Sequence, residues 1–223
     1  MVVQNEAVRD VAEEDLATHA YQGQRGHMQK DIRNLARHGL VHQGRFEGSD
    51  ASSRELLTLT KSARKLLRSN RMVSRDQSLY SGFVKPREAN HDADIYCLYQ
   101  KEATRIEAAG GKNLRVVLDF ELKKKLNRDF ATFGMESKEQ IALRHGLRVV
   151  NGKIPVPDLR IEYETRDGEQ GRVALELATE HYRPRQLAEK VRAGFSIYAH
   201  SGEADRLRRV LDQRDLTAEI LSL

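Results

Sequence analysis

One segment near the start of the chain restricts the possible folds more than any other, because it changes periodicity twice in a fixed order. Residues 13–21 begin with acidic side chains and place apolar residues at helical spacing. A turn containing two glycines covers residues 22–26, and a second apolar stripe follows at Met28, Ile32, Leu35 and Ala36. These patterns predict two short helices joined by a tight turn.

The second of these helices has a polar and basic face opposite its apolar stripe. Its side chains are of the types that contact phosphates and base edges when a helix enters the major groove of DNA. Gly39 is expected to end the helix. The residues predicted to contact DNA from this helix are Arg25, His27, Gln29, Lys30, Arg33, Asn34 and Arg37.

A basic hairpin and a third helix are predicted next. Residues 40–46 and 55–60 are typical of two strands, and the Gly, Ser and Asp residues between them form a flexible tip. Residues 61–68 follow as a helix with a basic exposed side. This region adds five predicted DNA contacts, namely Arg45, Arg54, Lys61, Arg64 and Lys65.

Helix, turn, helix, hairpin and closing helix in this order resemble a winged helix-turn-helix domain, here residues 1–72. Leu59-Thr60-Lys61 is similar to the strand end that commonly leads into the closing helix of such domains. Residues 1–12 would then form a shortened first helix, or belong to a surface for a partner. The alternative for the whole segment is a small helical domain whose basic face is only solvated.

Composition limits the class of protein. The 223 residues include 38 Lys and Arg against 33 Asp and Glu, which gives a net charge of +5 and favours a nucleic-acid partner. We find neither a long apolar run nor a secretion signal, so a cytoplasmic protein without a membrane span is expected. Cys97 is the only cysteine and is expected in the core, which leaves no intrachain disulfide or cysteine-based zinc site.

The remainder predicts a linker at residues 73–90, with one short strand at 79–84, and then a second domain at 91–223. The two domains together predict an α/β (α+β) fold with a mixed sheet. A turn at 166–169 is expected to join two antiparallel strands. The expected elements of the second domain are helices at 91–109, 122–133, 138–145, 184–199 and 204–214, and strands at 114–120, 156–164, 172–178 and 217–223.

Two carboxylates mark a candidate catalytic site on that hairpin. Asp158 begins one strand after Pro157, and Glu176 lies near the end of the next, so the two are expected side by side. Neighbouring carboxylates are the hard oxygen ligands that Mg²⁺ or Mn²⁺ prefers, and such a metal can activate water for phosphodiester hydrolysis.

The order of helix, strand, hairpin, helix and strand resembles the PD-(D/E)xK nuclease-like fold. That family has a Lys two residues after the second acid, where this chain has Ala178, so the catalytic set is incomplete. Lys190, one turn after Gln186 on the following helix, is the replacement that the resemblance implies. Glu102 or Glu107 is a possible further metal ligand.

Other sites and reaction classes have less support. Glu121 and Lys123 form a literal Glu-x-Lys, but helical periodicity makes them an exposed helix start. His181 and Tyr182 are interpreted as a strand-end pair. The histidines lack the spacing of a two-histidine relaxase, and neither a phosphate-binding loop nor a Gly-x-Ser-x-Gly elbow is present.

Both halves together resemble the replication-relaxation family of plasmid and mobile-element proteins, through the amino-terminal helices and through Asp158, Glu176, Lys190, Phe195 and Tyr198. The resemblance implies binding of double-stranded DNA, with a relaxase or a replication initiator as a further partner. A homodimer on a palindromic site is plausible. Two hypotheses result. In the first the chain is a DNA-binding protein with a degenerate nuclease domain, and in the second it is a metal-dependent endonuclease or nickase using Asp158, Glu176 and Lys190.

Overall fold

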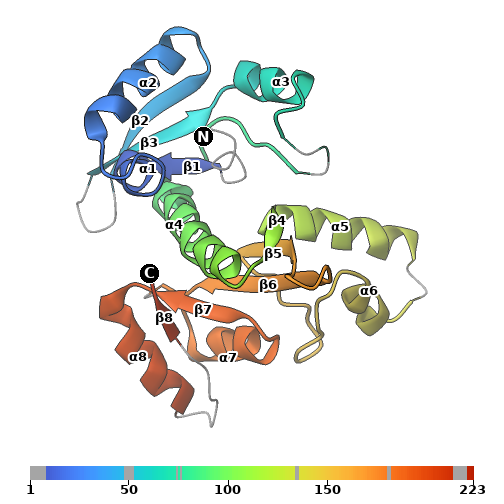
Figure 1. Cartoon of the computed structure of the whole chain (residues 1–223). Helices are drawn as coiled ribbons and strands as arrows, with labels where there is room; N and C mark the ends of the chain where they lie inside the picture. The colour runs from blue at the N-terminus through green and yellow to red at the C-terminus, as the bar shows by residue number, and fades with distance from the viewer. Residues whose placement is uncertain are drawn as a thin grey trace. The chain divides into compact units, whose positions relative to one another are not determined.

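The computed structural model divides the chain into two compact units, Met1–Glu102 and Ala103–Leu223. The division falls inside a long helix, α4 (Pro86–Ala108), and Figure 1 shows the elements of both units. The residues that the structure describes are 9–47, 53–73, 75, 77–133, 136–179, 182–212 and 220–223.

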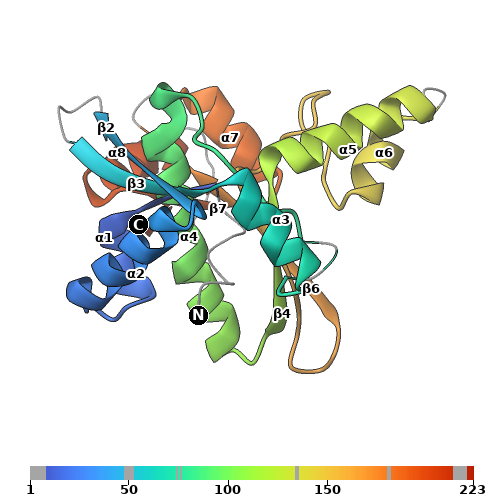
Figure 2. The same cartoon turned by 90° about the horizontal axis from the view of Figure 1, so that it is seen from above.

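The first unit combines a small antiparallel sheet with short helices. Strand β3 lies in the centre of the sheet, with β1 and β2 on its two sides, and both pairs are antiparallel. Figure 2 shows β2 and β3 as a hairpin that leads into α3. Before α4 the unit contains β1 (Asp10–Ala12), α1 (Glu13–His19), α2 (Arg25–Arg37), β2 (Val41–Glu47), β3 (Ser53–Leu59) and α3 (Lys61–Ser69).

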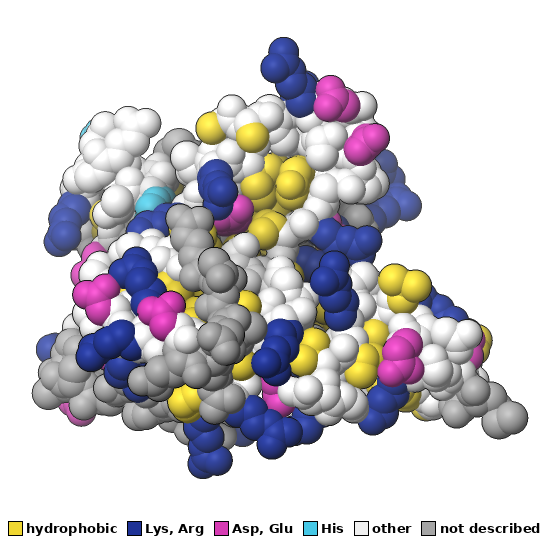
Figure 3. All heavy atoms as spheres, turned by 90° about the horizontal axis from the view of Figure 1, so that it is seen from below, with side chains coloured by type: hydrophobic (Ala, Val, Ile, Leu, Met, Phe, Trp, Pro, Cys, Tyr) yellow, Lys and Arg dark blue, Asp and Glu magenta, His cyan; other side chains and the backbone are white. Residues whose placement is uncertain are grey.

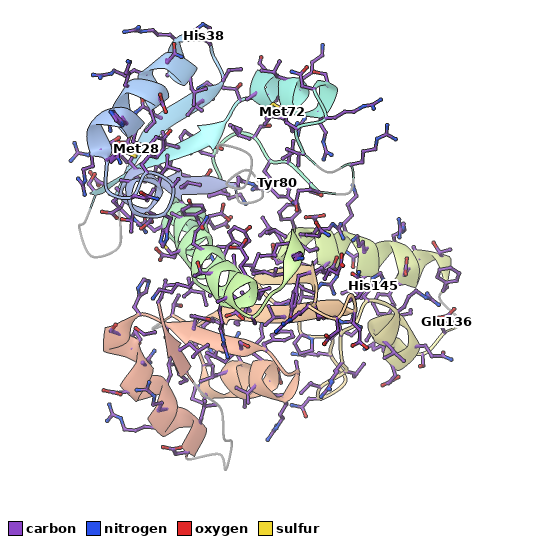
Figure 4. The ribbon with its side chains drawn as sticks, viewed as in Figure 1. Met28, His38, Met72, Tyr80, Glu136 and His145 are labelled. Carbon is purple, nitrogen blue, oxygen red and sulfur yellow. The ribbon has the colours of Figure 1, made fainter. Side chains whose placement is uncertain are left out.

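The helices and the hairpin of this unit agree with the sequence patterns. Met28 and Ile32 of α2 pack with Ala17 of α1 and Leu57 of β3 in one apolar cluster, and Figure 4 labels Met28 there. The side chain of Thr60 accepts a hydrogen bond from the Ala63 backbone N–H and so caps α3. The apolar stripe and the cap explain why these residues form helices at these positions.

Three expectations for this unit were wrong. Residues 10–12 form a strand instead of a shortened helix, because Val11 and Ala12 are buried against β3, while residues 1–8 lie outside the described part. The strand expected at 79–84 is not formed; the Gly82 N–H donates to the Leu59 carbonyl at 2.9 Å, and the Val84 N–H to the carboxylate of Asp10 at 3.1 Å. The last part of the expected linker, from Pro86, already belongs to α4.

The second unit is built on a five-stranded mixed sheet in the order β4-β5-β6-β7-β8. Strands β4, β5 and β6 pair antiparallel with one another, whereas β7 is parallel to β6 and β8 is parallel to β7. This confirms a mixed α/β architecture. The elements after α4 are β4 (Lys112–Leu118), α5 (Asp119–Thr132), α6 (Lys138–Arg144), β5 (Leu159–Glu164), β6 (Gln170–Leu177), α7 (Pro184–Arg192), β7 (Ser196–Ala199), α8 (Ser201–Asp212) and β8 (Ile220–Ser222).

The hairpin of β5 and β6 forms as predicted, with Gly168 at a φ of 81° in its turn. The helix expected over residues 184–199 is wrong in its second half. It ends at Arg192, Gly194 adopts a φ of 86°, and residues from Ser196 form β7 beside β6. A glycine with positive φ is a common helix end, and parallel pairing then satisfies the backbone of the next residues.

One face of the sheet is covered by helices. Ala178, Ile197 and Ala199 contribute to a buried cluster that includes residues of α5, α6, α7 and α8. Helix α6 lies beside α5 in both Figure 1 and Figure 2. Within the described residues, we find no helix with the length and apolar character needed to cross a membrane.

Candidate functional site

The two acids predicted from the sequence lie opposite each other on the β5–β6 hairpin. The Cα register pairs Leu159 with Leu175, which places Asp158 across from Glu176. The Asp158 N–H donates to Oε2 of Glu176 at 3.2 Å, and the Leu177 N–H donates to Oδ2 of Asp158 at 3.0 Å. Side chain and backbone therefore hold the two carboxylates in one position.

Lys190 joins this pair from α7. Its ammonium Nζ lies 2.6 Å from Oε1 of Glu176 and donates to the Val156 carbonyl at 2.7 Å. The same ammonium lies 5.6 Å from the ring centroid of Phe195. The structure thus brings together Asp158, Glu176 and Lys190, the three residues singled out in the sequence, in one acid–lysine cluster.

Tyr182 is a fourth member of the acid–lysine cluster, and the sequence did not indicate it. Its hydroxyl donates to Oε1 of Glu176. Tyr182 lies in the loop before α7, so its interpretation as a strand-end residue was wrong, while His181 lies outside the described residues. Periodicity assigns no facing direction to a loop residue, and we see no sequence signal that could have found this contact.

Burial controls the charge of the cluster. The Glu176 side chain is fully buried, and this burial raises the pKa of Glu176 to about 7, with the Asp158 carboxylate adding to the rise. Lys190 and the Tyr182 hydroxyl lower the pKa of Glu176 and partly offset this rise. Burial and the neighbouring Glu176 also raise the pKa of the Tyr182 hydroxyl. The central carboxyl therefore changes charge close to neutral pH.

The residues present do not fit a resident divalent metal in this arrangement. Both Glu176 oxygens already accept hydrogen bonds, Oε1 from Tyr182 and Lys190 and Oε2 from the Asp158 N–H. The described residues include no group of three or more His, Cys, Asp or Glu side chains that could hold a metal ion. Because magnesium and manganese bind through free carboxylate oxygens, completed by waters and substrate phosphates, Glu176 would first have to release these hydrogen bonds.

The other candidates from the sequence lie elsewhere. Glu107 is exposed at the end of α4, and Glu102 is buried in the first unit. The rival Glu-x-Lys segment is the first turn of α5, where Lys123 pairs with Asp119 at 2.5 Å along the helix. That segment is the exposed helix start that periodicity predicted.

Most of the residues predicted to contact DNA lie on accessible surfaces of the first unit. Gln29 differs, because it is half-buried and donates to Oε2 of Glu13 at 2.5 Å. Arg45 is exposed on β2 and donates to the Ser53 hydroxyl at 2.5 Å. The predicted residues that are exposed on α2 and α3 are Arg25, His27, Lys30, Arg33, Asn34, Arg37, Lys61, Arg64 and Lys65.

Arg54 has a different role from the one predicted. Its guanidinium lies 2.7 Å from Asp15, 2.6 Å from Asp94 and 3.3 Å from Glu14, and its side chain is only 18% exposed. It therefore connects α1 and α4 within the first unit instead of facing a ligand. Cys97 is close to the same acids, and burial raises the pKa of its thiol, which suits a packing residue more than a nucleophile.

A polar hollow lies between the end of α1 and the start of α2. Its volume is about 430 Å³, and its wall includes His27 and Lys30 together with Asp31, which accepts a hydrogen bond from the Tyr21 hydroxyl at 3.0 Å. On the face seen in Figure 3, Lys and Arg side chains are distributed over the surface with Asp and Glu side chains between them. A single acidic or basic patch does not dominate that view.

Comparison with known proteins identifies no relative: no family model matches the chain, and neither a curated protein nor a solved structure is significantly similar to it.

Proposed function

We propose that this chain binds double-stranded DNA through its first unit. The observation that carries the proposal is the position of α2. Its apolar side, with Met28 and Ile32, is buried, while Arg33 and Asn34 are exposed on its other side. A helix that is anchored by one face and presents Arg and Asn on the other can enter a major groove and contact bases.

The surrounding elements support the same proposal. Strands β2 and β3 form a hairpin after α2, and α3 follows with Lys61, Arg64 and Lys65 exposed. Together with the three-stranded sheet, this order supports a winged helix-turn-helix domain. Basic side chains on the hairpin and on α3 would contact phosphates beside the groove.

For the second unit we propose a nuclease-like fold that has lost cleavage activity. The order α4, β4, β5, β6, α7 and β7 supports the PD-(D/E)xK resemblance, with α5 and α6 inserted after β4. The convergence of Asp158, Glu176 and Lys190 favours an endonuclease or nickase as second candidate. Against it, Glu176 is fully buried and both of its oxygens are engaged.

Membership in the replication-relaxation family is part of the proposal, and its support is the combination of the two element orders in one chain. A relaxase or a replication initiator would then be a protein partner, and a homodimer on a palindromic site is the expected assembly. Sedimentation of the protein with and without duplex tests the dimer directly.

The first experiment incubates the purified chain with supercoiled plasmid, with and without Mg²⁺ or Mn²⁺, and reads mobility shift and nicking from the same samples. We expect a shift that weakens steeply with salt, and no nicking. Nicking that requires the metal and is lost in Glu176→Ala would replace this proposal by the nickase.

Variants of α2 test the recognition helix. Arg33→Ala and Asn34→Ala should each weaken binding to a preferred duplex, by about 1–3 kcal/mol where the side chain contacts a base. Gln29→Ala is the comparison on the same helix: its side chain is engaged by Glu13, so we expect a smaller loss than at Arg33 or Asn34. Equal affinities and site preferences for all three variants and the parent would show that α2 does not read DNA.

A further inference from the structure

Three arginines share one face of the second unit's sheet. Arg115 of β4 and Arg172 of β6 lie opposite Glu162 of β5 on its two sides. Arg160 is two residues before Glu162, so strand alternation puts it on the same face. We call Arg115, Arg160 and Arg172 the arginine cluster.

Neighbouring groups hold the arginine cluster in place. Arg115 Nη1 lies 2.7 Å from Oε2 of Glu162, and Arg160 Nη2 lies 2.7 Å from Oε1 of the same carboxylate. Arg160 also donates to the His145 carbonyl at 2.6 Å. His145 follows α6 and pairs with Asp129 of α5 at 2.9 Å, and Figure 4 labels its position.

The turn after α6, at His145 and Gly146, contacts the arginine cluster. At Gly146, a Cβ atom would lie 1.6 Å from Nη1 of Arg172, so the Arg172 guanidinium rests directly against this glycine. Because Gly146 follows His145 in the chain, one turn contacts both Arg160 and Arg172. The guanidinium groups are therefore arranged by backbone as well as by Glu162.

Arg115 and Arg160 share one carboxylate, that of Glu162, which lies between Arg115 and Arg172 in the sheet. Burial lowers the pKa of Arg160, Glu162 raises it, and both Arg172 and Arg115 lower it further. Arg160 is 5% exposed, and its buried Nε has no hydrogen-bond partner among the described residues. Guanidinium groups held close together repel one another, and a bound anion would reduce this cost in free energy.

The chemistry of the cluster selects the kind of anion. Guanidinium groups match the oxygens of phosphate through paired hydrogen bonds, which lysine does not provide. Arg172 is exposed and the Arg115 side chain is 23% exposed, so both can meet a ligand from solvent, while Arg160 lies behind them.

We infer that the arginine cluster binds a phosphate group of the DNA backbone, with Arg115 and Arg172 as the contacting residues and Arg160 positioning them. This inference rests on the proposed DNA binding and adds a contact in the second unit. If DNA were bound only by α2 and its hairpin, these arginines would not affect affinity. DNA binding by the first unit and phosphate binding by the arginine cluster can therefore be tested separately.

The test measures the affinity of the full chain for a fluorescent duplex over a series of salt concentrations. Arg172→Gln and Arg115→Gln should each weaken binding about tenfold and reduce the slope of log K against log salt by about 0.9, the value for one phosphate contact. Arg209→Gln, which removes an equal charge from exposed α8, is the control and should leave the slope unchanged.

Further variants separate binding from folding. Arg172→Lys keeps the charge but loses the paired hydrogen bonds, so its affinity should fall between those of the parent and Arg172→Gln. Circular dichroism of every variant establishes that it is folded. If the parent binds DNA and loses affinity in Arg33→Ala, while Arg115→Gln and Arg172→Gln behave like Arg209→Gln, the inference is wrong and the proposed function stands. A parent that binds no duplex overturns both.

Discussion

The ammonium of Lys190 lies 2.6 Å from the carboxylate of Glu176, a side chain that is fully buried. Burial removes water from this carboxylate, and Lys190 and Tyr182 supply hydrogen bonds that replace it. Removal of either partner should therefore destabilise the junction of β6 and α7, whether or not the second unit acts on DNA.

A double-mutant cycle measures this pairing. Lys190→Met should destabilise the chain by about 3 kcal/mol at pH 8, where Glu176 is ionised, and by less at pH 5, where its protonated form needs no cation. When Lys190→Met is combined with Glu176→Gln, the loss in the free energy of unfolding should be smaller than the sum of the two single losses by about 1–3 kcal/mol. Urea unfolding provides the three values, and simple additivity would show that the pair is not coupled.

A second buried acid predicts a pH dependence in the first unit. Burial raises the pKa of Asp10 to about 7, and the nearby Asp92 adds to the rise, whereas the Val84 N–H and Thr58 lower it. With a pKa above that of the unfolded chain, Asp10 contributes stability that is complete below about pH 4. That contribution is lost as the pH rises through 7.

Asp10→Asn should remove this dependence, because the amide stays neutral and its oxygen can still accept from the Val84 N–H. At pH 8 the variant should exceed the parent by at most about 4 kcal/mol, the limit set by the pKa difference. Hydrogen exchange of the β1 and β3 amides between pH 4 and 8 is the measurement. A parent with flat protection over this range would contradict the prediction.

Arg54 provides a prediction about stability rather than binding. Arg54→Ala leaves Glu14, Asp15 and Asp94 together without their shared cation, and should cost about 2 kcal/mol after allowance for partial exposure. Arg45→Ala, on the same hairpin with a 73% exposed side chain, should change stability by less than about 0.5 kcal/mol. Thermal unfolding compares the two variants. Equal losses of stability would show that Arg54 contributes no more to the fold than the exposed Arg45 does.

The acid–lysine cluster was largely predictable because it depends on local rules. Alternation along two strands joined by a short turn places Asp158 beside Glu176, and the amphipathic α7 follows directly with Lys190. The antiparallel pairing of β5 with β6 was predictable for the same reason. Helices and strands with clear periodicity, such as α2 and β6, need little information from the rest of the chain.

The errors occurred where distant residues decide the outcome. Arg54 looks like a free cation in the sequence, but one of its partners, Asp94, is forty residues away in the chain. Residues 79–84 lack a strand, and the Val84 N–H at their end bonds to the side chain of Asp10, 74 residues earlier in the chain. Ser196 to Ala199 become a strand through pairing with β6, which a helical reading of their neighbours did not anticipate.

Two glycines in the second unit allow strain and binding to be separated. Gly146 and Gly152 both have positive φ, 63° and 71°, so alanine at either position should cost about 1–2 kcal/mol of stability. They differ in what a methyl group meets. At Gly146 it displaces the guanidinium of Arg172, while at Gly152 no atom lies within 4 Å.

Because the end of an arginine side chain moves easily, the two alanine variants should unfold at similar temperatures. Gly146→Ala should nevertheless weaken duplex binding about as much as Arg172→Gln does, since the guanidinium loses its place beside Arg115. Gly152→Ala should bind like the parent. Thermal unfolding and anisotropy titration of the same preparations decide this. Equal affinities of the two variants would mean that the position of Arg172 against the turn has no part in DNA binding.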